Sequence, residues 1–123
     1  MRFDNILGSM MLFQKMYRDY CEELKSFEPE LPPFRSSFFR KSIIANWSLH
    51  KYLIVDEDEG VVGFIILSQF DQLFPKPAQY IVDFYILPDK RRKGFGAEAF
   101  NHFLQTSSGD FFLYVLEKNA PAQ

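Results

Sequence analysis

The sequence predicts an α/β fold in which two helices come first, a β-hairpin follows, and a strand–helix–strand unit ends the chain. Three observations carry this prediction. Apolar residues recur at helical spacing near the N-terminus, β-branched residues fill two runs around an acidic turn, and a strand leads into a helix across Gly94 and Gly96. A chain of 123 residues suffices for one hydrophobic core, so we expect a single domain over residues 1–123.

The composition is that of a folded protein, with 47% hydrophobic and 18% aromatic residues. A net charge of −2 argues against bulk attraction to nucleic acid or to an anionic membrane. Cys21 is the one cysteine, so no internal disulfide forms and a reducing compartment is expected. The N-terminus lacks the layout of a secretory signal, and no apolar run is long enough to span a bilayer. We therefore expect a cytoplasmic protein without nucleic-acid or membrane partners.

Two helices are predicted in the first part of the chain. Residues 9–27 form an amphipathic helix with Ser9 as its N-cap, and its inward stripe consists of Leu12, Phe13, Met16, Tyr17, Tyr20, Leu24 and Phe27. Cys21 lies beside this stripe and is interpreted as packing material. After the proline-rich loop 28–36, residues 37–47 form a shorter helix whose inward residues are Phe39, Ile43, Ile44 and Trp47.

The central segment 51–70 is predicted to be a β-hairpin, because two β-rich runs flank the acidic turn Asp56–Glu59 and Gly60. The four acids are interpreted as a solvated tip and not as a cation site. A second proline-broken loop, 71–77, leads to a strand at 79–87. A helix at 95–106 and a strand at 111–119 follow, and the inward residues of the helix are Ala97, Phe100, Phe103 and Leu104. The strand–helix–strand unit should have parallel strands.

The loop between that strand and that helix has a composition suited to anion binding. Arg91, Arg92 and Lys93 precede Gly94 and Gly96, at a place where a helix N-terminus exposes unpaired N–H groups. Glycines allow a sharp turn and a close approach of the backbone to a ligand. Together these features favour a pyrophosphate site, although neither a Walker loop nor a complete GxGxxG fingerprint is present. A solvated turn is the alternative.

The run IVDFYILPDKRRKGFGAEAFNHF resembles the coenzyme-A-binding segment of the GNAT superfamily of N-acetyltransferases. The family signature Arg/Gln-x-x-Gly-x-Gly/Ala is met by Arg91, Gly94 and Gly96, after a strand that closes at Pro88. The order of the preceding elements is also similar, so the resemblance covers most of the chain. It implies an acyltransferase-like mixed sheet and transfer of an acetyl group from acetyl-CoA to a primary amine of a small molecule or peptide.

The resemblance also implies a set of site residues. The backbone of Phe84 and Ile86 would bond the acetyl carbonyl and the pantetheine arm, with the Phe84 N–H as the oxyanion donor. The remaining coenzyme-binding residues would be Arg91, Arg92, Lys93, Gly94, Phe95, Gly96, Ala97 and Asn119. No metal site is expected.

The sequence departs from the family pattern at two places. Tyr80 occupies the position of the usual glutamate base, and Asp83, on the same strand with opposite side-chain parity, is the candidate base. The alternative is that Asp83 partners the basic loop. The chain also stops at Gln123, where a further helix and two strands would begin, and its first strand is reduced to a stub. From the apolar final strand we expect a homo-oligomer, most simply a dimer.

Two alternative functions stay open at this stage. A catalytically degenerate member of the same family would bind coenzyme A, or only fold, without turnover. An RNA-binding module is the remote alternative, because Lys93-Gly94-Phe95-Gly96 and Phe100 resemble the RNP1 element, which must lie on a strand. The acceptor is not readable from the sequence; loops 28–36 and 71–78 are expected to contribute to its site.

Overall fold

The computed structural model describes residues 1–70, 78–106 and 110–113. Its elements, in chain order, are β1 (Arg2–Asn5), the 3-10 turn η1 (Ile6–Ser9), α1 (Met10–Phe27), α2 (Ser36–Phe38), the π-helical turn η2 (Phe39–Ile44), β2 (Leu49–Asp56), β3 (Gly60–Phe70), β4 (Ala78–Ile86), the 3-10 turn η3 (Pro88–Lys90), α3 (Phe95–Thr106) and β5 (Asp110–Leu113). The short N-terminal segment thus forms a four-residue strand, β1.

The strands form one mixed sheet in the order β1-β2-β3-β4-β5. Neighbours are antiparallel from β1 to β4, whereas β5 runs parallel to β4. The predicted hairpin is confirmed: β2 and β3 pair around the acidic turn, and Gly60 has the positive φ of +74° that favours glycine there. The parallel strand–helix–strand unit β4-α3-β5 is confirmed as well.

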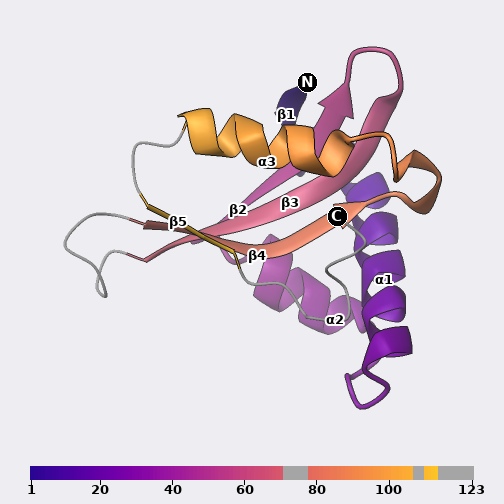
Figure 1. Cartoon of the computed structure of the whole chain (residues 1–123). Helices are drawn as coiled ribbons and strands as arrows, with labels where there is room; N and C mark the ends of the chain where they lie inside the picture. The colour runs from indigo at the N-terminus through magenta and orange to yellow at the C-terminus, as the bar shows by residue number, and fades with distance from the viewer. Residues whose placement is uncertain (71–77, 107–109, 114–123) are drawn as a thin grey trace.

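Helices cover both faces of the sheet: α3 lies on one face, and α1 and α2 lie on the other (Figure 1). Each face has its own buried core. The α1 side is rich in aromatic side chains, among them Phe13, Tyr17, Tyr20, Phe64 and Tyr85. The α3 side is mainly aliphatic and includes Ile54, Val62, Ile65, Ile81, Ile86, Phe95 and Ala99. Burial of these side chains supplies the main stabilising free energy.

Helix α1 follows the predicted stripe with one correction. Phe13, Met16, Tyr17 and Tyr20 are buried, but Leu12 is exposed because it lies on the flank of the helix. Ser9 is the N-cap residue, yet its side chain makes no capping hydrogen bond.

The prediction that Trp47 lies inward is wrong, since its side chain is 89% exposed. The helix ends at Ile44 and not at 47, so helical spacing no longer places Trp47. The ammonium group of Lys51 caps the C-terminal end of this helix. It donates to the carbonyls of Ile43, Ile44 and Asn46 at 3.0, 3.2 and 2.9 Å. The last carbonyls of a helix lack partners within the helix, so a cation beside them stabilises the helix end.

Helix α3 occupies the predicted range, but its buried face is rotated from the predicted one. Phe95 and Ala99 are buried, whereas Ala97 is exposed. Phe100 packs partly buried against the α3-side core. The side chains of Phe103 and Leu104, and the predicted strand beyond Leu113, lie outside what the structure describes.

Candidate functional site

The loop between β4 and α3 turns twice through the left-handed region of backbone conformation. Arg92 has a φ of 63° and Gly94 a φ of 85°. A Cβ at Gly94 would meet no atom within 4 Å, so glycine is favoured there by conformation and not by space. Arg92 adopts this conformation with a side chain, which is uncommon and typical of functional loops.

These turns leave a run of backbone donors at the N-terminus of α3. The Glu98 N–H donates to the Gly94 carbonyl at 3.0 Å and begins the helical ladder. The N–H groups of the preceding residues, from Arg92 to Ala97, have no hydrogen-bond acceptor among the residues that the structure describes. Consecutive free donors at a helix N-terminus form a binding concavity for an anion.

The Arg91 side chain is held by contacts with α1 and β4. Its guanidinium donates to both carboxylate oxygens of Glu23 on α1, each at 2.6 Å, and its Nε donates to the Ile86 carbonyl at 2.8 Å. It also lies 5.4 Å from the centre of the Tyr85 ring. The hydrogen bonds to Glu23 raise the pKa of Arg91 above its ordinary value. Arg91 therefore anchors the loop to α1, and a contact between its side chain and a coenzyme stays a prediction.

Glu59, at the tip of the β2–β3 hairpin, forms ion pairs with both lysines of the loop. Lys93 Nζ lies 2.8 Å and Lys90 Nζ 3.3 Å from Glu59 Oε1. The hydrogen bond with Lys93, and then that with Lys90, lowers the pKa of Glu59. Within the described part of the chain, Arg92 makes no ion pair. The loop thus presents backbone donors and the charge of Arg92 rather than the three free cations that the sequence indicates.

Strand β4 supplies the second part of the predicted site. The Leu87 N–H donates to the Val62 carbonyl of β3 at 2.8 Å, and backbone groups alternate along a strand. Phe84 and Ile86 therefore present their backbone groups to the edge opposite β3. The described part of β5 pairs with β4 only at Ala78–Ile81. Phe84 and Ile86 lie beyond that pairing, which is where a coenzyme arm could bond to the strand.

A β-bulge decides the direction of Asp83. The β3–β4 register pairs Leu67 with Ile81 and Ile66 with Asp83, so Val82 is the extra residue. Ile81 packs in the α3-side core, while Asp83 Oδ1 accepts a hydrogen bond of 2.6 Å from the Tyr20 hydroxyl on α1. Strict alternation would place Asp83 on the same face of the sheet as Ile81. The bulge instead places Asp83 on the opposite face, beneath α1.

Asp83 is not the partner of the basic loop, so that alternative is wrong. The loop cations pair with Glu23 and Glu59, whereas Asp83 pairs with Tyr20. Burial raises the pKa of Asp83, and the hydrogen bond from Tyr20 opposes this rise. A carboxyl with a raised pKa is suited to accept a proton near neutral pH.

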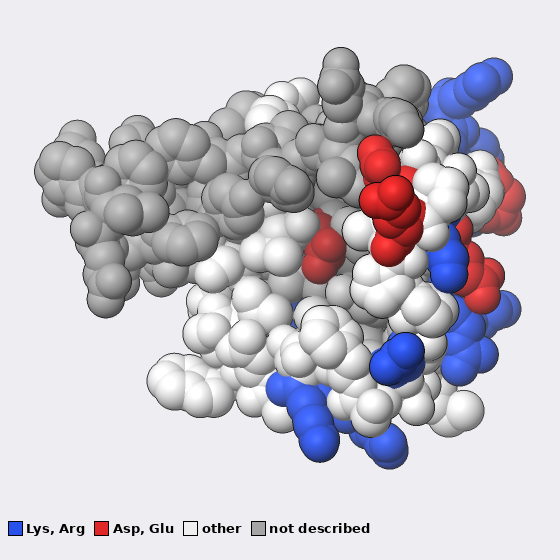
Figure 2. Space-filling model, turned by 90° about the horizontal axis from the view of Figure 1, so that it is seen from below, with Lys and Arg blue, Asp and Glu red and all other residues white. Residues whose placement is uncertain are grey.

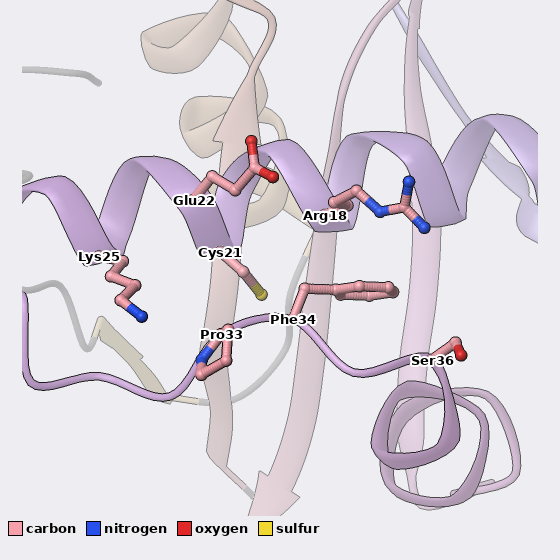
Figure 3. Close-up of a pocket in the computed structure, with 7 residues that line it drawn as sticks. All are labelled: Arg18, Cys21, Glu22, Lys25, Pro33, Phe34 and Ser36. Carbon is pink, nitrogen blue, oxygen red and sulfur yellow. The ribbon is translucent and has the colours of Figure 1, made fainter.

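A cavity of about 320 Å³ lies between α1 and the segment 33–36 (Figure 3). Its lining residues are Arg18, Cys21, Glu22, Lys25, Pro33, Phe34 and Ser36. In Figure 3 the Cys21 thiol points toward Pro33 and Phe34, while Glu22 points away from them. Burial, followed by the charge of Asp83, raises the pKa of Cys21 to about 11, so the thiol stays protonated at neutral pH.

Loop 28–36 thus borders a cavity, whereas most of loop 71–78 and Asn119 lie outside the described residues. Figure 2 shows both acidic and basic side chains among the described residues of the face that carries α1 and α2. In the described ranges, no group of three or more His, Cys, Asp or Glu side chains has metal-binding geometry. None of the helices described there is both long and apolar enough for a membrane span.

Sequence reasoning missed Glu23, Glu59 and Tyr20. The acidic composition of the hairpin tip was the available signal for Glu59, because it complements the basic loop. The RNA-binding alternative requires the RNP1 residues to lie on a strand, whereas Phe95 and Phe100 lie on α3, the helix that the sequence predicts. Phe95 is also buried, so it cannot stack on a base.

Solved structures with the same fold support this description. A candidate acetyltransferase from Clostridium difficile 630 superposes with a TM-score of 0.73 at 17% identity, over 97% of this chain and 82% of that one. The candidate acetyltransferase YycN from Bacillus subtilis gives a TM-score of 0.72 at 15% identity, over 98% and 85%. An aminoglycoside acetyltransferase from an uncultured soil metagenomic sample, in complex with sisomicin, gives 0.59 at 16% identity, over 94% and 75%.

No curated protein matches the sequence significantly. The sequence model of the acetyltransferase (GNAT) family, by contrast, matches residues 13–123, which include most of α1, the hairpin, the basic loop and α3. The chain therefore belongs to the GNAT family of acetyltransferases.

Proposed function

We propose that the chain transfers an acetyl group from acetyl-CoA to a primary amine of a small molecule or peptide. One observation carries the proposal: the N–H groups of Arg92 to Ala97 have no acceptor among the described residues, and beside the exposed Arg92 side chain they are suited to bind a pyrophosphate. When bound, acetyl-CoA would supply an activated acyl group as a thioester.

The residues of this chain have separate roles in the proposed reaction. The amides of the loop bind the pyrophosphate, and the edge of β4 at Phe84 and Ile86, beyond the described pairing with β5, orients the pantetheine arm. The Phe84 N–H stabilises the negative charge that develops on the acyl oxygen as the amine attacks. Asp83 removes the proton that the attacking nitrogen loses, and the departing thiolate then takes up a proton from solvent.

The proposed acceptor site is the cavity between α1 and the segment 33–36. Cys21 lines this cavity and follows Tyr20, whose hydroxyl donates to Asp83, which supports proximity of the cavity to the proposed base. The ring of Phe34 borders the cavity under the guanidinium of Arg18, 5.1 Å from the ring centre. An amine with a part that packs against an aromatic ring would suit these surroundings.

Calorimetric titration with acetyl-CoA tests the binding half of the proposal. We expect saturable binding by the natural chain and its loss in Gly94→Val, because a branched side chain disfavours the φ of 85° that shapes the loop. Gly60→Val is the matched control, since Gly60 also has a positive φ and open space but lies outside the loop. Equal binding by the natural chain and Gly94→Val would contradict the loop assignment.

Release of free thiol from acetyl-CoA in the presence of a panel of primary amines tests the transfer half. Turnover that depends on the amine and falls in Asp83→Asn is expected. Binding without turnover of any amine would instead indicate the alternative, a coenzyme-binding module that has lost catalysis.

A further inference from the structure

We propose that Tyr20 is a positioning residue for the transfer reaction: its hydroxyl holds the carboxylate of Asp83 so that the second carboxylate oxygen faces the amine. The inference rests on the proposed function, in which Asp83 accepts the proton. It adds a residue of α1 to a site that the loop and β4 otherwise form.

The Tyr20 hydroxyl is fixed by the packing of its ring. The side chain is only 7% exposed. The ring contacts Phe64 and Tyr85 edge-on, with centroids 5.5 and 5.8 Å apart, and Tyr17 at 5.7 Å. Rings interlocked in this manner cannot turn without disturbing the core. The hydroxyl therefore offers Asp83 a donor at a constant position, 2.6 Å from Oδ1.

Asp83 has one oxygen engaged and one available. Tyr20 donates to Oδ1, whereas Oδ2 has no hydrogen-bond or ion-pair partner among the residues that the structure describes. The bulge at Val82 brings the carboxyl to the α1 side, where Tyr20 meets it. A base with one anchored oxygen and one free oxygen has a defined direction for proton transfer, which is what general-base catalysis requires.

The groups that face Asp83 favour this role. From α1 these are Tyr17, Tyr20 and Cys21, and burial raises the pKa of each, so all three are neutral at physiological pH. From β3 the residue across the ladder is the apolar Ile66. Within the described residues no cation pairs with Asp83. Burial raises the pKa of Asp83 and the Tyr20 hydrogen bond lowers it, so Tyr20 is the group that favours the carboxylate over the acid.

Tyr20→Phe removes the hydroxyl and keeps the packed ring, and Tyr17→Phe is its matched control. Tyr17 is buried to a similar extent, 8% exposed, in the same aromatic core, and its hydroxyl has no hydrogen-bond partner among the described residues. The loss of one buried hydroxyl is therefore common to both variants, and the contact with Asp83 is specific to Tyr20.

The test combines a carboxyl carbon NMR titration of Asp83, assigned with Asp83→Asn, with the pH profile of kcat/KM. In Tyr20→Phe we expect the pKa of Asp83 to rise, the acid limb of the profile to move to higher pH by the same amount, and the plateau to fall roughly tenfold or more as the base loses its orientation. In Tyr17→Phe we expect the titration and the acid limb to match those of the natural chain.

Two results overturn different claims. If the natural chain turns over amines but Tyr20→Phe leaves both the titration of Asp83 and the acid limb unchanged, the positioning role is wrong and the proposed function stands. If the natural chain binds acetyl-CoA and acetylates no amine, the proposed reaction is wrong, and the positioning role falls with it.

Discussion

Arg91 and Glu23 form a two-pronged ion pair, with both oxygens of the Glu23 carboxylate at 2.6 Å from guanidinium nitrogens of Arg91. The pair joins the loop after β4 to the C-terminal part of α1, two segments that are 68 residues apart in sequence. The family signature residue Arg91 thereby has a structural role that does not involve a coenzyme. It fixes the backbone that carries the N–H groups of Arg92 to Ala97, for which the described part of the chain supplies no acceptor.

Glu23→Gln should destabilise the protein by about 2 kcal/mol, because a charge-assisted pair is lost and the guanidinium of Arg91 remains only partly solvated. Both side chains are 22% exposed, so solvent screening is moderate. Urea unfolding at neutral pH measures the change. Glu22→Gln, a substitution of the exposed neighbour on the same helix, should alter the free energy of unfolding by less than about 0.5 kcal/mol. Equal effects of the two substitutions would contradict an anchoring role for Glu23.

Gly63→Ala should weaken the pairing of β3 with β4. A Cβ at this position would lie 2.0 Å from the Tyr85 carbonyl oxygen, which belongs to the backbone and cannot move aside without displacing β4. We expect a loss of about 3 kcal/mol in unfolding free energy. In Gly8→Ala, where a Cβ meets no atom within 4 Å, the change should stay below about 0.5 kcal/mol. A Gly63→Ala protein as stable as Gly8→Ala would mean that the two strands separate more easily than their register indicates.

Glu59→Gln should strengthen the binding of coenzyme A. Glu59 holds Lys93 and Lys90, and an uncharged amide in its place frees both ammonium groups for phosphate. Calorimetry at low and high ionic strength measures the gain, which should shrink as salt screens the added attraction. Glu57→Gln, on the exposed part of the same turn, is the control for loss of one acidic charge. Weaker binding by Glu59→Gln than by Glu57→Gln would show that Glu59 supports the loop instead of competing for its cations.

The free energy of unfolding of Asp83→Asn, relative to that of the natural chain, should increase as pH rises. The folded protein holds the Asp83 proton above the ordinary pKa of 3.8, because burial raises that pKa. Between 3.8 and the raised value the folded state binds more protons than the unfolded state, so the contribution of Asp83 to stability falls with rising pH. Asparagine has no such dependence.

The stability difference between Asp83→Asn and the natural chain should therefore be smallest near pH 4, grow through this window, and level off above it. Urea unfolding at a series of pH values measures it. Asp58→Asn, at an exposed position, controls for the removal of one carboxyl group. A difference that is constant with pH would mean that Asp83 titrates alike in the folded and unfolded states.

Local patterns predicted much of the fold and part of the site. Helical spacing gave the range of α1, the acidic turn with Gly60 gave the hairpin, and the signature at Arg91, Gly94 and Gly96 gave the loop before α3. These features depend on residues within a few positions of one another. The predicted inward position of Trp47 is wrong because a π-helical turn and the Lys51 contacts end the second helix early.

The contacts that shape the site depend on tertiary structure. Glu59 meets Lys93 across 34 residues of sequence, and Tyr20 meets Asp83 across 63. The bulge at Val82 shifts the alternation of β4, and no residue type signals it. Asn119, the homodimer and the cytoplasmic location stay predictions, because the described residues do not test them.

A thermal-shift titration with acetyl-CoA, with adenosine as the control ligand, tests the central claim most directly. Ligand at about a hundred times its dissociation constant should add roughly 2.7 kcal/mol to the stability of the folded state. A saturable rise in Tm with acetyl-CoA and none with adenosine is the predicted result, because the free N–H groups of the loop recognise the pyrophosphate. An unchanged Tm at millimolar acetyl-CoA, in a chain that unfolds cooperatively, would contradict the assignment of the loop as a coenzyme site.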